Sequence, residues 1–318
     1  MKNVFKAKIS IVLSLYNEAK GVSYFCNLLV NELQKTPLFL FELLWVNDGS
    51  SDNTQELIDD FVESSQIKNI VHKRIQFSRN FGHESAMIAG IDNATGDVVI
   101  CMDSDGQHPP ESIKYLIESF FKGNDIVLTE RIERGDSSII KKLFSKLFYK
   151  LINSLSSIYF QENSTDFFLI SKQVAIVLRE SFRDQTRFIR GFVQSVGFRK
   201  TILKFKAPPR LYGDSNYSYW GLFKLAINAI FSFSNKPLRI SVGLSFLFFF
   251  FTLILGGYTL YKFYYDNTAP TGYTTIIIFL SVSFSVLFIS LAIISLYFEK
   301  LIKEVRTRPI YIIKEKVL

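Results

Sequence analysis

The stretch that decides the fold is Val99-Ile100-Cys101-Met102-Asp103-Ser104-Asp105-Gly106-Gln107-His108-Pro109-Pro110. Its apolar beginning predicts a buried strand, which ends in two carboxylates with one residue between them. Ligands bind at the carboxyl edge of α/β sheets, and carboxylate and amide oxygens suit a hard cation such as Mg²⁺ or Mn²⁺. A solvated turn before the next helix is the alternative, because Asp, Gly and Pro are common turn residues.

Short apolar segments alternate with amphipathic helical patterns along the first 130 residues. The predicted strands are 9–15, 41–46, 70–77, 98–102 and 126–129. The predicted helices are 20–35, 53–64, 83–93 and 110–121. This order is typical of an α/β, Rossmann-like fold with a mostly parallel sheet, in which the loops after the strands share one edge.

Polar loops follow four of these strands at the shared edge. They contain Tyr16-Asn17-Glu18, the segment 47–52, Ser78-Arg79-Asn80 and the Asp103 segment. Each loop alone fits a turn or a helix cap, and Asp52 in particular suits a helix N-terminus. Together they bring acidic residues, arginines and a metal-type Asp pair to one edge, which favours a nucleoside-diphosphate site.

Two late segments, 240–261 and 267–298, contain no charged residue. Each reaches the roughly 20 residues needed to cross a bilayer. The basic residues outside them are Lys224, Lys236, Arg239, Lys300, Lys303, Arg306 and Arg308, whereas the connecting loop has Lys262 alone. The distribution predicts two transmembrane helices with both termini in the cytoplasm, and the lack of intramembrane charge argues against a transporter or channel.

Charge and cysteine content restrict the partners and the compartment. The 37 Lys and Arg residues outnumber the 29 Asp and Glu residues, for a net charge of +8. This charge gathers near the membrane segments without a nucleic-acid motif, so anionic lipid or a phosphorylated substrate is the expected partner, and nucleic acid is not. Cys26 and Cys101 lie in apolar surroundings without metal-ligand spacing, which indicates a reducing compartment.

Three ordered motifs, at 10–18, 46–52 and 103–111, resemble family 2 glycosyltransferases of the GT-A fold. With the two C-terminal spans, nearly the whole chain resembles the polyisoprenyl-phosphate glycosyltransferases of that family. The resemblance implies a metal-dependent, inverting membrane enzyme that uses Mg²⁺ or Mn²⁺. It would transfer a hexose, with glucose from UDP-glucose as the first choice, to undecaprenyl or another polyprenyl phosphate, giving a lipid-linked sugar for cell-surface glycans.

The resemblance also assigns roles to single residues. It implies nucleotide-sugar contacts for Leu15, Tyr16, Glu18, Asp48, Arg79 and Asp103. The implied metal ligands are Asp103, Asp105 and Gln107. The implied catalytic residues are Asp105, Asp166, Arg131 and Arg134, and the implied contacts to the acceptor phosphate are Arg187, Arg190 and Arg210. A phosphate monoester with a second pKa of about 6 is already largely ionised near neutral pH, so Asp166 is expected to orient groups rather than to act as a general base.

The resemblance divides the chain into four parts. They are a cytoplasmic GT-A domain over 1–208, an interfacial amphipathic region over 209–238, transmembrane helices within 239–298 (about 239–262 and 273–298) and a cytoplasmic tail over 299–318. A second basic amphipathic helix is predicted over 139–152. The β-forming run in the tail needs a sheet edge, in its own chain or in a neighbouring subunit, so a homo-oligomer through the tail is one expectation. The predicted location is the inner (cytoplasmic) membrane.

Two departures from the family pattern keep other functions open. Phe168 and Asn216 stand where relatives often have arginine and lysine. One alternative is therefore a catalytically degenerate membrane scaffold that binds nucleotide. The other is a processive polysaccharide synthase, although the Gln-x-x-Arg-Trp motif and the extra spans associated with that group are absent from this sequence.

Overall fold

The computed structural model describes residues 6–65, 67–132, 153–154, 161, 164–185, 187–208, 236–265 and 272–318. The chain divides into two compact units. The first comprises 1–149, 158–218 and 308–318, and the second comprises 150–157 and 219–307. Arg134, Arg210, Asn216, the predicted helix 139–152 and the predicted interfacial region up to residue 235 lie outside the described residues.

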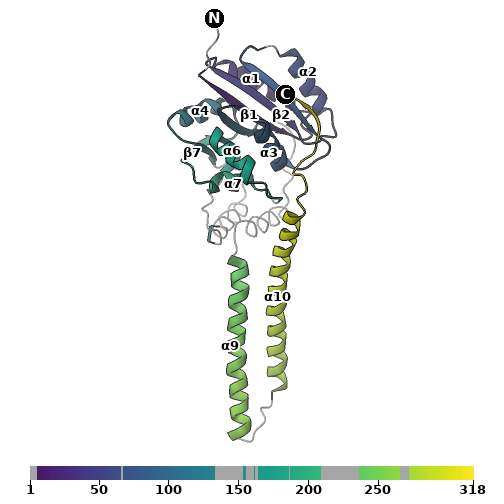
Figure 1. Ribbon diagram of the computed structural model, residues 1–318, viewed down its shortest axis with the longest axis vertical. Helices are drawn as coiled ribbons and strands as arrows, with labels where there is room; N and C mark the ends of the chain where they lie inside the picture. Colours follow the sequence, from purple (N-terminus) through teal and green to yellow (C-terminus); the bar gives the residue numbers. More distant parts are fainter. Residues whose placement is uncertain are drawn as a thin grey trace. The chain divides into compact units, whose positions relative to one another are not determined.

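An eight-stranded mixed sheet forms the centre of the first unit, with strand order β7-β5-β6-β4-β1-β2-β3-β8 (Figure 1). The strands are β1 (Ala7–Leu15), β2 (Phe39–Asn47), β3 (Ile70–Phe77), β4 (Val98–Asp103), β5 (Ile126–Ile132), β6 (Ser164–Ser171), β7 (Lys200–Lys206) and β8 (Ile313–Val317). Among the strands of the described residues, only β6 and β8 run antiparallel to the strands that they pair with. The predicted α/β class with a mostly parallel sheet is confirmed.

Helices cover both faces of this sheet. They are α1 (Val22–Gln34), α2 (Thr54–Ser64), α3 (His83–Asn93), α4 (Ile113–Phe121), α6 (Lys172–Ser181) and α7 (Ile189–Ser195), with a 3₁₀ turn, η1 (Pro110–Ser112), before α4. The helices α1, α2 and α4 share one side, and α3, α6 and α7 pack together on the other. Both faces of the parallel strands are therefore buried, which explains their nearly continuous apolar sequences.

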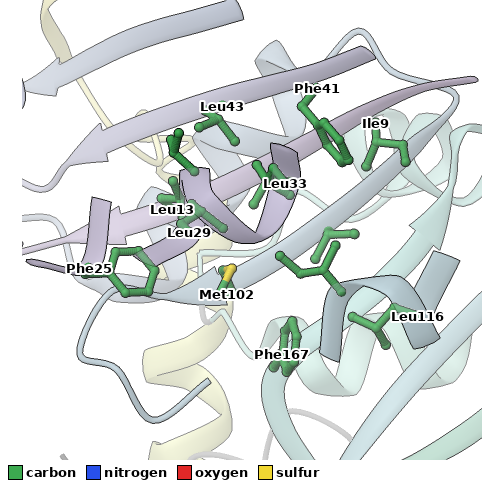
Figure 2. Close-up of a cluster of buried hydrophobic side chains, with 14 of the residues drawn as sticks. Ile9, Leu13, Phe25, Leu29, Leu33, Phe41, Leu43, Met102, Leu116 and Phe167 are labelled. Carbon is green, nitrogen blue, oxygen red and sulfur yellow. The ribbon is translucent and has the colours of Figure 1, made fainter. Parts of the chain in front are cut away.

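The main core lies between β1, β2 and the apolar side of α1. Figure 2 shows Phe25, Leu29 and Leu33 of α1 beside Leu13 and Phe41 of the sheet. These side chains are at most 1% exposed. Full burial of one such side chain contributes roughly 1.5–3 kcal/mol, so this contact fixes α1 and the loop before it at the carboxyl end of β1.

Gly90 allows α3 to lie directly against β1. A Cβ atom built on Gly90 would lie 2.1 Å from Cγ1 of Val12, whose side chain is fully buried. We expect Gly90→Ala to lower the free energy of unfolding by about 1–3 kcal/mol through overpacking, measured by thermal melting in detergent. Val12→Ala removes the clashing methyl groups, so the double variant should be more stable than the sum of the two single effects predicts. Simple additivity would contradict this contact.

The second unit contains two long apolar helices, α9 (Lys236–Tyr265) and α10 (Tyr273–Val305). By length and composition, Lys236–Lys262 and Ile278–Val305 qualify as candidate membrane spans. Many of their apolar side chains are exposed, among them Phe246, Phe249 and Phe288. Such an exposed apolar surface is expected where a helix faces lipid rather than water.

Candidate active site

The sheet topology brings the predicted loops to one edge. Leu15 at the end of β1 pairs with Asn47 at the end of β2, and Ser14 pairs with Asp103 at the end of β4. Because β6 and β8 are antiparallel, their amino ends reach this same edge. The loops after β1 to β4 therefore lie together, as the sequence predicted.

The loops after β1 and β2 hold each other through hydrogen bonds. The Ser51 N–H donates to Oδ1 of Asn17 (2.9 Å), the Ala19 N–H donates to Oδ2 of Asp52 (3.2 Å), and the Glu18 N–H donates to Oγ1 of Thr54 (2.9 Å). Asn17 has a φ of 55°, a left-handed conformation that asparagine tolerates better than most residues.

Tyr16 and Leu15, two residues predicted to contact the nucleotide, differ in their exposure to solvent. The Tyr16 side chain stays 46% exposed, whereas that of Leu15 is fully buried and its carbonyl accepts the Asp48 N–H (2.9 Å). Tyr16 is thus able to stack on a planar ligand, while Leu15 shapes the loop from inside the core.

Asp48 connects the loop after β2 to the 78–82 loop, which follows β3. Its carboxylate oxygens accept the N–H groups of Phe81 (2.7 Å) and Gly82 (2.9 Å). Burial raises the pKa of Asp48, although these two bonds oppose the rise. Gly49 has a φ of +65°, and its missing Cβ would lie 2.3 Å from the Arg79 carbonyl carbon, so only glycine allows this close approach.

Arg79 lies on the exposed surface of the 78–82 loop. Its guanidinium carbon is 4.0 Å from the centre of the Phe81 ring, and Nη1 donates to the Asn80 carbonyl (2.8 Å). The loop therefore presents a cation at the edge predicted to bind the nucleotide.

The stretch after β4 forms a compact loop with a buried histidine beneath it. The Gln107 N–H donates to Oδ1 of Asp105 (2.9 Å), and the Gln107 side-chain oxygen accepts from Nη2 of Arg131 (3.2 Å). His108 stacks on Phe167, and its Nδ1 accepts the Asp103 N–H (2.8 Å). Burial lowers the pKa of His108, so this histidine supports the loop as a neutral ring.

A cluster of charged groups joins this loop to β6 and α7. Nε2 of His83 lies 3.3 Å from Oδ1 of Asp103 and 3.6 Å from Oδ2 of Asp166. Arg190 Nε lies 2.9 Å from Oδ1 of Asp166, and the other histidine nitrogen, Nδ1, is 2.9 Å from Oγ of Ser14. The cluster thus unites the first carboxylate after β4 with the predicted catalytic aspartate.

These neighbours determine the charge of the cluster. Burial lowers the pKa of His83, but Asp103 and Asp166 outweigh burial and raise it to about 10. Burial likewise raises the pKa of Asp166, but Arg190 and His83 hold it well below its usual range. Near neutral pH, Asp166 is therefore an anion between two cations and not a proton acceptor.

The donor atoms present suit a divalent cation. Asp103 and Asp105 supply carboxylate oxygens close to Gln107, and Oδ1 of Asp103, although it lies 3.3 Å from Nε2 of His83, accepts no hydrogen bond from the described part of the chain. Among the described residues there is no group of three or more His, Cys, Asp or Glu that could hold a metal by itself. Oxygens of a bound diphosphate would complete such a coordination shell.

The structure brings together most of the predicted site. Asp103, Asp166 and Arg190 are connected through His83, and Asp105 and Arg131 are connected through Gln107. Arg187 instead donates to the backbone carbonyls of Phe81 (3.4 Å) and Ile310 (3.1 Å). The sequence analysis missed His83, although its position directly after a loop of the shared edge was a usable signal.

The comparison with protein families agrees with the loops described above. Residues 10–182, which contain most of β1 and all of β2 to β6, match the family model for glycosyl transferase family 2. The chain belongs to glycosyl transferase family 2. The predicted family and the prediction of an enzyme that transfers a sugar are both confirmed.

Relatives of this family 2 chain match along nearly its whole length. An uncharacterized glycosyltransferase of Synechocystis, sll0501, is 34% identical over 97% of this chain and 95% of the relative. The prophage bactoprenol glucosyl transferase homolog of Escherichia coli is 32% identical over 96% of this chain and 98% of the relative. Among solved structures, the mannosyltransferase PcManGT of Pyrobaculum calidifontis, in complex with GDP-Man and Mn²⁺, is 12% identical over 91% of this chain and 88% of its own, with a TM-score of 0.42.

Proposed function

We propose that this family 2 enzyme transfers glucose from a nucleotide sugar, UDP-glucose in the first place, to undecaprenyl (bactoprenol) phosphate. The observation that carries the proposal is the end-to-end similarity, including both apolar helices, to a relative named for bactoprenol glucosyl transfer. The product would be a lipid-linked glucose for modification of a cell-surface glycan. The similarity to this relative continues through both apolar helices, and helices long enough to span a membrane fit a lipid acceptor better than a soluble one.

We assign the donor to the edge formed by the loops after β1 to β4. Tyr16, Glu18, Asp48 and Arg79 would surround the base and ribose, with Leu15 behind them. Asp103, Asp105 and Gln107 would hold Mg²⁺ or Mn²⁺, which supplies the positive charge that stabilises the departing diphosphate. The Gln107 side-chain oxygen also accepts a hydrogen bond from Arg131, so the loop after β4 can hold this arginine close to the same diphosphate.

We assign the acceptor phosphate to the arginines beyond the metal site. A phosphate oxygen attacks the anomeric carbon while the bond to the nucleoside diphosphate breaks, and attack from the opposite face inverts the configuration. Asp166 would hold Arg190 by the 2.9 Å ion pair, so that the guanidinium faces the phosphate in a fixed orientation. Arg134 and Arg210 are proposed as further catalytic and phosphate contacts on the basis of the sequence motifs.

We place α9 and α10 across the inner membrane, with the family 2 domain on the cytoplasmic side. The basic residues around the start of α9 and the end of α10 support this orientation. Tyr258, Tyr261, Tyr264 and Tyr265 near the end of α9 are exposed, as expected for an aromatic belt at the opposite interface. Because β8 already lies at the edge of its own sheet, a homo-oligomer through the tail would pair along the outer edge of β8.

The deciding experiment incubates the purified protein with radiolabelled UDP-glucose, undecaprenyl phosphate and Mg²⁺ or Mn²⁺. We expect a metal-dependent labelled product that extracts into organic solvent. A long labelled polymer would instead identify a processive synthase, and nucleotide binding without any product would identify a scaffold. UDP-galactose and GDP-mannose serve as control donors, because a donor with another hexose or another base should give a lower yield of product.

A further inference from the structure

The segment directly after α10 returns to the family 2 domain and packs beside β3. We call residues 308–312 the tail latch. In Figure 1 the yellow C-terminal segment ends beside the sheet, at the marker C. The strand β8 in this segment pairs antiparallel with β3. Within the latch, Ile310 is only 6% exposed, and the Tyr311 ring stacks on Phe77 at 5.2 Å with an interplanar angle of 6°. The Tyr311 hydroxyl donates to Oδ2 of Asp92 (2.7 Å), which fixes the ring from its other end.

The tail latch also bonds to the 78–82 loop through the backbone. The Ser78 N–H donates to the Ile312 carbonyl at 3.0 Å. Arg187 Nη1 lies within reach of two carbonyls, that of Ile310 in the latch (3.1 Å) and that of Phe81 in the loop (3.4 Å). One guanidinium therefore connects the latch to the loop, although the two are far apart in the sequence.

The same loop is also bound by Asp48, which accepts the Phe81 and Gly82 N–H groups. Both a buried carboxylate and the tail latch therefore hold the loop. It carries Arg79 on its exposed side and leads directly into His83, whose ring lies beside Asp103 and Asp166. A shift of the loop would move all of these groups relative to the donor edge.

We propose that Tyr311 and Arg187 are positioning residues for the donor, acting through the 78–82 loop. The inference rests on the proposed function, because it takes this loop to face the nucleotide. A loop ordered before the nucleotide arrives lowers the conformational cost of binding. The tail latch supplies this order, and it gives Arg187 a role different from the acceptor-phosphate contact that the sequence suggested.

The first test compares Tyr311→Ala with Tyr311→Phe in the full-length protein. We expect Tyr311→Ala to raise the Kd for UDP, measured by calorimetry, and the KM for UDP-glucose by about tenfold, with kcat changed less than about twofold. Tyr311→Phe keeps the stacked ring and should recover most of the affinity. Lys314→Ala, an exposed substitution in β8, is the matched control and should match the wild type. A fall in kcat alone would overturn the proposal.

The second test separates the two possible roles of Arg187. If Arg187 and Tyr311 act through one latch, the double alanine variant should raise the Kd for UDP little more than the stronger single variant does. Independent effects that multiply to about a hundredfold would overturn the shared role. An Arg187→Ala variant that raised only the KM for undecaprenyl phosphate would likewise overturn it and restore the phosphate contact.

The third test needs no turnover, so it distinguishes failure of this inference from failure of the proposed function. Hydrogen exchange of residues 78–82 should become faster in Tyr311→Ala than in the wild type or Lys314→Ala, while exchange in β1 stays slow. Unchanged exchange in the loop would overturn the latch, whatever the activity. Faster exchange in a protein that transfers no sugar would support the latch and reject the proposed function. If Tyr311→Ala fails to fold, Tyr311→Leu, which loses the ring stacked on Phe77 but keeps an apolar side chain, replaces it.

Discussion

Asp105→Ala should lower the rate of sugar transfer by at least about a thousandfold, while the protein stays folded and inserted in the membrane. Asp105 supplies one of the two carboxylates after β4, and its Oδ1 also fixes the loop by accepting the Gln107 N–H. Its loss removes both a proposed metal ligand and the hydrogen bond to the Gln107 backbone. The measurement is the initial rate of labelled lipid formation at saturating Mg²⁺ or Mn²⁺.

Asp97→Asn is the matched control for this variant. Asp97 lies just before the amino end of β4, where its side chain accepts the Lys8 N–H (3.0 Å), far along the strand from the proposed metal ligands. Its substitution should leave the transfer rate within about twofold of the wild type, since it touches no group at the donor edge. Full metal-dependent turnover by Asp105→Ala would refute the assignment of the metal site.

Glu42→Ala should cause the largest loss of stability, about 3–5 kcal/mol in the free energy of unfolding. Glu42 lies within β2 and is fully buried. Its carboxylate accepts hydrogen bonds from Ser10 Oγ (2.5 Å) and from the Thr95 N–H (2.8 Å), and Nζ atoms of Lys73 (2.9 Å) and Lys8 (3.0 Å) lie against it. Alanine would leave the largely buried Lys73 ammonium without its carboxylate. Thermal melting in detergent measures the loss.

The same carboxylate predicts a pH dependence of stability. Burial raises the pKa of Glu42, but the bonds from Ser10, Thr95 and Lys73 outweigh burial and lower it to about 2. The unfolded chain therefore binds a proton before the folded chain does, so stability should fall as the pH drops from about 4.5 through 2. Glu42→Gln should flatten this part of the curve. If Glu42→Ala melted at the same temperature as the wild type, the hydrogen bonds and ion pairs of Glu42 would contribute nothing to the stability of the fold.

Much of the first unit follows from local sequence patterns. The predicted strand 70–77 and helix 83–93 coincide with β3 and α3, and the other strands and helices predicted within the first 130 residues match to within about three residues. The loops at the donor edge were also predictable, because parallel strands place their carboxyl ends together whatever the details of packing.

The remaining features depend on contacts between distant segments. β6 enters the sheet antiparallel between β4 and β5, and nothing in its own sequence specifies that insertion. Asp103 on β4 and Asp166 on β6 raise the pKa of His83, which lies at the start of α3. The sequence suggests that Arg187 binds phosphate, whereas in the structure its Nη1 donates to the Ile310 carbonyl. Periodicity and short motifs carry no information on such pairings.

The position of β8 in the chain imposes an order on biosynthesis. Residues 313–317 are translated after both α9 and α10, so the outer edge of β3 stays unpaired while the two apolar helices leave the ribosome. During this interval the nascent sheet exposes an open edge, which is the kind of surface that chaperones protect from aggregation. Completion of the sheet and ordering of the 78–82 loop consequently follow synthesis of α9 and α10, and a ribosome stalled within α10 would hold a first unit whose proposed donor site is not yet ordered for tight binding.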